Sequence, residues 1–120
     1  MNKNAIHSRF DSAILGGNGR HIEISIHHNE DATCTLIAQS GTAGNRPDRQ
    51  KAQGPYESAE HALAARRAII HALTTRGFYP VISAIPRWSI DAQREIRRIR
   101  EQRMASTVNY QFDPEELFPR

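Results

Sequence analysis

The sequence predicts an α+β fold: a small antiparallel β-sheet of three to four strands with one helix packed on it, plus a C-terminal Arg-rich helix and an extended tail. Three observations predict this class. Apolar and polar residues alternate over residues 20–28, a second apolar segment at 32–39 follows a short turn, and a capped helical pattern occupies residues 59–76.

The clearest strand pattern lies at residues 20–28. Isoleucine recurs at every second position, and His, Glu and Ser occupy the positions between, which is typical of a half-buried strand. The apolar side consists of Ile22, Ile24 and Ile26. The other side is therefore predicted to be polar.

Turn residues delimit this strand and predict its neighbours. The Gly-rich stretch at 15–19 and the Asn-Glu-Asp stretch at 29–31 favour turns, because Gly and Asn tolerate positive φ angles. A second strand is therefore expected at 32–39 and a third at 51–56. Apolar residues before the first turn, among them Ile14, predict an earlier strand.

The best-defined helix is predicted at residues 59–76, where Ser58 is a good N-cap and Gly77 a good residue to follow the C-terminus. Its apolar stripe consists of Ala62, Ala65, Ile69 and Leu73. Arg66 projects into this stripe, so either its stem packs there while its head reaches water, or it pairs with a buried acid. We expect Arg66 to be partly buried and paired, with Glu23 or Asp91 as the partner.

A second helix is predicted over residues 89–106, with Ser89 as its cap. Its narrow apolar stripe consists of Ala92, Ile96 and Ile99. Residues 1–86 are expected to form the core, and residues 87–120 form the Arg-rich helix and acidic-apolar tail, as part of the same domain or as an appendage.

The composition is that of a small protein with a modest core. The chain has 120 residues, a formal net charge of +3 and 38% apolar residues. Cys34 is the single cysteine and cannot form an internal disulfide. No apolar run approaches the roughly 18 residues that span a bilayer, and no signal peptide is evident at the start. A cytoplasmic protein with no membrane partner is therefore expected.

Arginine dominates the positive charge. Of the 16 cationic residues only two, Lys3 and Lys51, are lysines. The planar guanidinium suits phosphate and carboxylate, although a GC-rich genome would also favour arginine. Charge therefore permits nucleic-acid binding without requiring it.

The glycine-rich stretch at 38–50 does not match a nucleotide-binding loop. It contains Gly41-x-x-Gly44 without the Lys-Ser/Thr pair of a phosphate-binding loop, and no helix starts directly after it. We interpret it as a mobile connection between strands, in which Gly41 and Gly44 permit unusual backbone angles. Its cations are expected to be fully solvated at the tip.

Part of the chain resembles the WGR domain, a family named for a Trp-Gly-Arg-Ile-Gly stretch. That stretch is followed by a strand, a Ser-x-Glu-x-Ala helix start and a closing Lys-Gly-Tyr. The matching stretches here are Ser-Gly-Thr-Ala-Gly at 40–44, the helix start at 56–63 and Arg-Gly-Phe at 76–78, so that the resemblance covers roughly residues 20–80.

The resemblance implies the WGR fold and, more weakly, contact with nucleic acid. Gly41 and Gly44 match the two glycines of the family motif. Its helix frame is matched by Ser58, Ala62, Gly77 and Phe78. Ser40 and Thr42 stand at the Trp and Arg positions, which in the family supply much of the contact with nucleic-acid ends.

No cofactor, metal site or catalytic residue is predicted. His21 and His27 lie six residues apart on one predicted strand, too far to share one ion, so they are interpreted as solvated. Cys34 is interpreted as a core residue rather than a nucleophile, because no motif activates it. Sequence alone cannot show the geometry that acid–base catalysis by Glu23 would need.

Two non-catalytic functions are favoured, and an enzymatic function is kept as a third alternative. The more favoured of the two is a small accessory protein that binds DNA or RNA through the basic loop and the Arg-rich helix. Its candidate binding residues are Arg46, Arg49, Lys51, Arg87, Arg94, Arg97 and Arg98.

The alternative is a protein-interaction module or inhibitor that uses the C-terminal helix and tail, with a foreign protein or a second copy of the chain as partner. Its candidate partner-binding residues are Tyr110, Phe112, Leu117 and Phe118.

Overall fold

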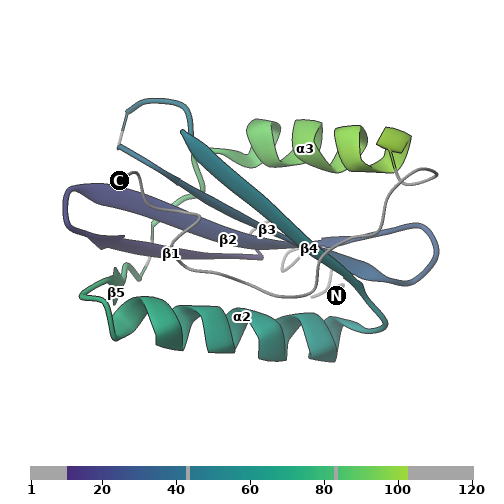
Figure 1. Cartoon of the computed structure of the whole chain (residues 1–120), viewed down its shortest axis with the longest axis horizontal. Coiled ribbons are helices and arrows are strands. Elements are labelled where there is room, and N and C mark those ends of the chain that lie inside the picture. The colour runs from purple at the N-terminus through teal and green to yellow at the C-terminus, as the bar shows by residue number, and fades with distance from the viewer. Residues whose placement is uncertain (1–10, 43, 83, 103–120) are drawn as a thin grey trace, which may run out of the picture.

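A five-stranded antiparallel sheet lies between two helices, α2 and α3, which cover its opposite faces (Figure 1). The computed structural model describes residues 11–42, 44–82 and 84–102. The strands are β1 (Ser12–Gly17), β2 (Arg20–His28), β3 (Cys34–Gly41), β4 (Arg49–Tyr56) and β5 (Tyr79–Pro80), in the spatial order β4-β3-β2-β1-β5. The predicted α+β class is confirmed, and the short β5 adds a strand that the sequence pattern did not predict.

The main core forms between the sheet and α2 (Ala59–Thr74). Alternation along β2 directs its isoleucines to this side, where they pack with Leu73 and Phe78. The complete cluster consists of Leu15, Ile22, Ile24, Leu36, Ala38, Ile69, Leu73 and Phe78. The period-two pattern of β2 and the helical stripe of α2 therefore meet as predicted.

The ends of α2 follow the predicted signals. The Ser58 hydroxyl accepts a hydrogen bond from the His61 amide at 3.2 Å, which satisfies one of the free donors at the helix start. Gly77 has a φ of +94°, in the left-handed region that glycine adopts without steric cost. The chain can therefore turn directly into β5.

Arg66 is partly buried and paired with a carboxylate, but the partner is Asp11, at 3.0 Å from Nη1. Arg66 also donates to the backbone oxygen of Asp11 at 3.2 Å. The predicted partners Glu23 and Asp91 are wrong because both are engaged on the α3 side of the sheet, whereas Arg66 belongs to α2.

The second helix, α3 (Ser89–Gln102), packs on the face of the sheet opposite α2. Its contact with Ile37 of β3 is made by Ala92 and Ile96. Ser89 is the first helical residue rather than the cap, because the carbonyl of Trp88 accepts the first helical bond, from the Ala92 amide at 2.9 Å. The predicted continuation over 103–106 lies outside the described residues.

The core interpretation predicts a large cost for truncating Leu73, whose side chain is 0% exposed. Leu73→Ala should lower the free energy of unfolding by about 2–4 kcal/mol, because it removes buried methyl groups and leaves a cavity. Leu63→Ala, in the same helix at 36% exposure, should cost clearly less. Chemical denaturation measures both variants. A Leu73→Ala loss below about 0.5 kcal/mol, the usual surface range, would contradict this packing.

Candidate functional site

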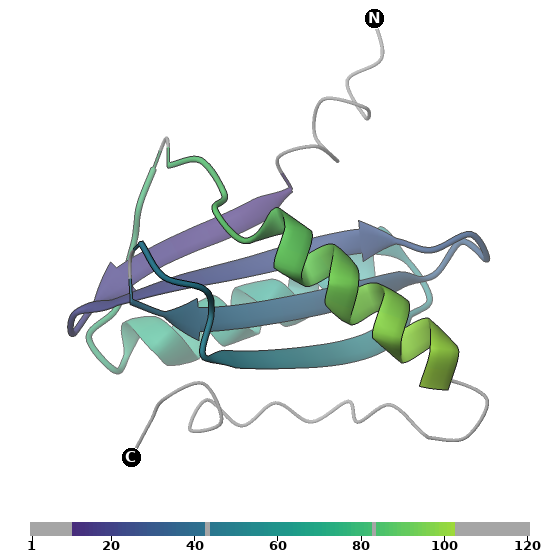
Figure 2. The same ribbon diagram turned by 90° about the horizontal axis from the view of Figure 1, so that it is seen from above.

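The two faces of β2 have different chemistry. Isoleucines occupy the α2 side, whereas the α3 side carries His21, Glu23, Ser25 and His27. α3 lies diagonally across this second face (Figure 2) and contacts Ile37 of β3. A hollow therefore remains between α3 and the polar residues of β1 and β2.

The first part of this hollow, here called the polar pocket, has a volume of about 450 Å³. Hydroxyl, amide, imidazole and carboxylate groups from both layers line it, together with apolar side chains of the segment before α3. Its principal polar lining residues are Ser12, Glu23, Ser25, His27, Gln39 and Gln93.

The second part, here called the basic groove, has a volume of about 410 Å³ and lies between the end of β2 and α3. It is lined by Ile26, His27, His28, Gln93, Ile96, Arg97 and Arg100. Ile26, His27 and Gln93 also line the polar pocket, so the two hollows adjoin. None of the lining residues of the basic groove is acidic.

Glu23 of β2 binds the segment that directly precedes α3. Its carboxylate is buried, with the residue only 1% exposed, and accepts hydrogen bonds from the backbone amides of Arg87 at 2.6 Å and Trp88 at 3.2 Å. His21 Nε2 lies 2.8 Å from Oε2 of the same carboxylate. The charge is thus taken up by polar groups, as a buried carboxylate requires.

Ser25 and His27 form a polar pair between the two hollows, with Oγ and Nε2 2.8 Å apart. Burial lowers the pKa of His27; nearby Asp11 opposes this, whereas His28 and Arg100 add to it. The neutral imidazole is therefore favoured, and His27 acts as a hydrogen-bonding group. The interpretation of His21 and His27 as solvated is wrong, since both are partly buried, whereas His28 is exposed.

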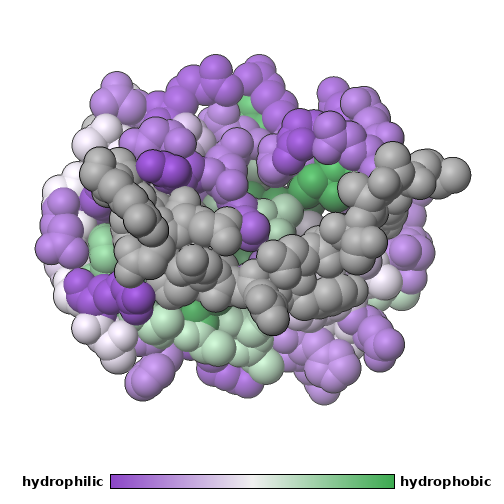
Figure 3. All heavy atoms as spheres, in the orientation of Figure 1, coloured by the Kyte–Doolittle hydropathy of each residue, from purple (hydrophilic) through white to green (hydrophobic). Residues whose placement is uncertain are grey.

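The positive charge of the groove comes from Arg97 and Arg100, which are one helical turn apart on α3. Arg97 makes no ion pair among the described residues, and Arg100 reaches Asn29 Oδ1 at 3.5 Å. Hydrophilic residues dominate the surface over α3 (Figure 3). Two guanidinium groups are thus available to an anion from solvent.

The structure distributes the predicted nucleic-acid-binding residues over several places. Arg94 and Arg97 are exposed on α3, whereas Arg98 is bound by Glu95, which it contacts through Nε at 2.9 Å. Arg87 is exposed in the segment before α3. The β4 residues Arg49 and Lys51 do not line the basic groove, and Arg100, which does, was not among the predicted residues.

Arg46 is occupied by an ion pair across the fold. Its Nη2 lies 2.8 Å from Asp91 Oδ1 in α3. The Arg46 side chain is 76% exposed, as expected for a solvated loop cation, but the expectation that it is free to meet a polyanion is wrong because of this ion pair. Sequence reasoning missed the pair because its members lie 45 residues apart and neither belongs to a motif.

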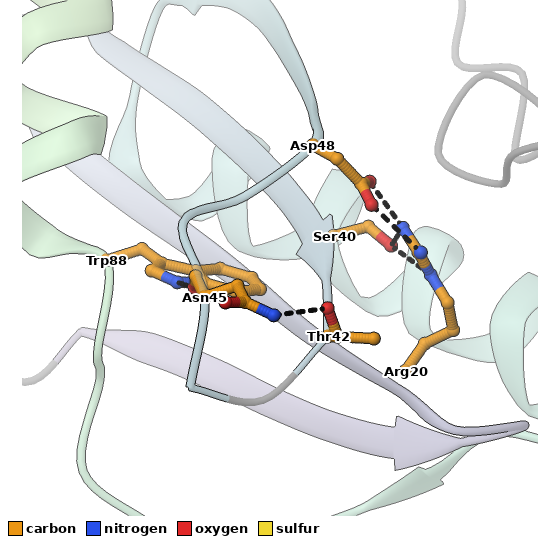
Figure 4. A network of polar contacts seen from close by, with 6 residues as sticks. All are labelled: Arg20, Ser40, Thr42, Asn45, Asp48 and Trp88. Atoms are coloured by element: carbon orange, nitrogen blue, oxygen red, sulfur yellow. Dashed lines mark hydrogen bonds and ion pairs between the residues drawn. The ribbon is translucent and has the colours of Figure 1, made fainter.

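The connection between β3 and β4 is largely exposed but is tied to the rest of the fold by polar contacts (Figure 4). Trp88 Nε1 donates to the Asn45 carbonyl at 2.8 Å, and Arg20 binds Asp48 at 3.0 Å and Ser40 at 2.9 Å. The Arg20 guanidinium lowers the pKa of the Asp48 carboxyl. Several long-range polar contacts thus hold this connection in place.

The two motif glycines have different roles. Gly44 has a φ of +89°, so the predicted unusual backbone angle is confirmed there. Gly41 has no positive φ; a Cβ at this position would instead meet the backbone of Arg46 and Pro47 at 3.2 Å. Gly41 is therefore required by the close approach of the returning chain.

The single cysteine belongs to the core. Cys34 is buried against Ile26 and Ala62, which confirms the core interpretation, and burial raises the pKa of its thiol.

In residues 11–42, 44–82 and 84–102, no three His, Cys, Asp or Glu side chains are grouped to hold a metal ion. Within the same ranges, no helix has the length and apolar character needed to span a membrane. The predicted partner residues Tyr110, Phe112, Leu117 and Phe118 lie outside the described part of the chain.

Comparison with known proteins gives one match. The family model described as PA4575-like protein matches residues 2–116. The resemblance to the WGR domain is wrong, because the matching family model is a different one and extends over nearly the whole chain. No curated protein and no solved structure matches. Short glycine motifs beside a capped helix are too common to have identified the family.

The anchoring role of Glu23 leads to a stability prediction. Glu23→Ala leaves the partly buried amide of Arg87 and the buried amide of Trp88 without an acceptor, so it should lower the free energy of unfolding by about 3 kcal/mol. Glu101→Ala, at an exposed position of α3, should cost less than about 0.5 kcal/mol. Urea denaturation followed by the fluorescence of the single tryptophan measures both. Equal losses in the two variants would refute the anchor.

The lowered pKa of His27 predicts a pH dependence of stability. The unfolded chain takes up this proton near pH 6.5, before the folded protein does, so the contribution of His27 is complete above about pH 6.5 and is lost as the pH falls through that value. His27→Gln should therefore reduce the drop in melting temperature between pH 7 and pH 5. His71→Gln, on the exposed side of α2, is the comparison variant. Identical drops in wild type and His27→Gln would contradict the prediction.

Proposed function

The chain belongs to the PA4575-like protein family, and we propose that it is a small non-catalytic accessory protein that binds nucleic acid along the basic groove and the adjoining face of α3. The observation that carries the proposal is the composition of the groove: two arginines and two histidines line it, and no carboxylate does. A cytoplasmic location, favoured by the lone cysteine, is part of this proposal.

The arrangement of arginines on α3 supports a ligand with several phosphates. Arg94, Arg97 and Arg100 recur at every third position, so successive side chains are displaced by about 4.5 Å along the helix. Arg94 and Arg97 have no carboxylate partner among the described residues. A row of available guanidinium groups suits a phosphodiester backbone better than a single small anion.

The proposed interface keeps the Arg-rich helix of the predicted interface and leaves out the loop. Arg46 neutralises Asp91, and Arg98 is held by Glu95, so neither is free to contact phosphate without breaking an ion pair. The proposed contacts are therefore Arg94, Arg97 and Arg100, together with the exposed His28, which also lines the groove.

A protein-interaction module is the second candidate function, favoured by a different surface. The segment between α2 and α3 and the first turn of α3 expose large apolar residues, including Ile82 at 88% and Ile85 at 72%. The set consists of Tyr79, Val81, Ile82, Ile85 and Ile90. Five exposed apolar side chains within twelve residues of the chain are more than isolated surface residues, and contiguous exposed apolar surface is typical of protein-binding sites.

The salt dependence of binding tests the favoured function. Arg97→Gln should weaken binding of a labelled oligonucleotide about equally for all sequences and reduce the slope of log affinity against log salt by about one, because one phosphate contact is lost. Fluorescence anisotropy over a series of salt concentrations measures both quantities.

Arg67→Gln is the matched control, since it removes the same charge from an exposed position on α2, across the sheet from the groove. It should leave the slope unchanged. Absence of binding at low salt would overturn the nucleic-acid proposal and favour the protein-interaction candidate. Equal slopes for the two variants would remove the groove from the interface.

A further inference from the structure

The polar pocket beside the basic groove points to the form of the nucleic acid. We infer that the ligand is a single strand, one of whose unpaired bases enters the polar pocket while an adjacent phosphate lies on Arg97 and Arg100. This inference rests on the proposed function and names the substrate class of the same site.

The two hollows form one continuous receptor. Ile26, His27 and Gln93 line both, so a ligand that occupies the basic groove extends directly over the mouth of the polar pocket. A nucleotide has the same layout, because its base and phosphate are joined through one sugar. The adjoining hollows therefore match the two ends of a single nucleotide unit.

The distribution of charge fixes the orientation of this unit. The polar pocket is lined by the carboxylates of Asp11 and Glu23 and by no Arg or Lys. The basic groove is lined by Arg97 and Arg100 and by no Asp or Glu. A phosphate finds no Arg or Lys in the first, where Asp11 is already paired with Arg66 and Glu23 with backbone amides, and it is attracted by the second, whereas an uncharged base is compatible with the pocket.

The groups that line the pocket suit the edge and the face of a base. Ser12, Ser25 and Gln93 can each donate or accept a hydrogen bond, as the edge of an unpaired base requires. Ile85 and Pro86 form an apolar part of the wall, against which the face of a base can pack. Such packing is tolerant of sequence, because every base has an apolar face.

A duplex would have to extrude a base before that base could enter the pocket. Its bases are paired and stacked, and extruding one costs a few kcal/mol, whereas a single strand presents its bases freely. The polar pocket lies between the helix and the sheet, where backbone contacts alone would leave it empty. A concave pocket next to a phosphate-binding groove therefore favours single strands over duplexes.

Four probes of equal length test the inference on the unaltered protein: labelled oligodeoxythymidylate, its duplex with oligodeoxyadenylate, an abasic deoxyribose-phosphate strand, and oligouridylate. The thymidylate or uridylate strand should bind about tenfold more tightly than the abasic strand, within the range measured for contacts of single bases. It should also bind more tightly than the duplex. Tighter binding of either strand supports the inference and identifies the sugar that the site prefers.

Ser89→Trp obstructs the pocket without touching the basic groove, because Ser89 lines only the former and is exposed. It should abolish the difference between base-containing and abasic strands and leave the salt dependence unchanged. Ala64→Trp, at an exposed position of α2, is the control and should preserve that difference. If Ser89→Trp does not fold, the comparison of the four probes on the unaltered protein decides the question alone.

The outcomes separate the two proposals. If no probe binds at low salt, nucleic-acid binding itself is wrong. If the single-stranded, abasic and duplex probes bind equally, nucleic-acid binding stands but the base-binding pocket is wrong. An unchanged preference for base-containing strands in Ser89→Trp would likewise overturn the pocket.

Discussion

The position of α3, and with it the shape of the candidate site, depends on the buried carboxylate of Glu23. A carboxylate is expensive to remove from water unless polar groups replace the solvent, and here two backbone amides and one imidazole do so. Those amides belong to Arg87 and Trp88, the residues directly before α3. One side chain of β2 thus holds the start of a helix that lies more than sixty residues later in the chain.

Trp88 extends this anchor to the rest of the site. Its carbonyl accepts hydrogen bonds from the Ala92 amide and from Gln39 Nε2, and its indole NH donates to the carbonyl of Asn45. The ring of His21 meets the indole edge-on, with centroids 4.9 Å apart. The connection between β3 and β4 is therefore fastened to the start of α3, and Gly41 is needed because the chain returns so close to it. The connection between β3 and β4, which the sequence predicts to be a mobile loop, therefore helps to position α3.

Sequence reasoning was successful where the signal is local and incomplete where the partner is distant. Period-two alternation identified β2, and the Ser58 cap with its apolar stripe identified α2, because these patterns report one face packed against a core. The same patterns do not say which residue lies across the sheet. The partner of Arg66, the two backbone amides bound by Glu23 and the ion pair of Arg46 all join positions separated by more than forty residues. The candidate site was predicted only in part: of the predicted binding residues only Arg97 lines a hollow, because the two hollows exist only once α3 is placed against β2.

The division of β2 into two chemically different sides explains why the site can exist in so small a domain. The isoleucine side supplies the main core with α2, so the opposite side does not have to be covered completely. α3 adds only a small second cluster, in which Ala92 and Ile96 meet Ile37. This narrow contact holds the helix on the sheet but leaves Ser25 and His27 beside a hollow. It also leaves Arg97 and Arg100 on the surface of the basic groove. Asp91 and Glu95 take part in ion pairs, whereas Arg97 and Arg100 line the basic groove, so one helix carries both neutralised and available charges. This distribution of charge follows from placing a helix with a narrow apolar stripe across a sheet whose second face is polar.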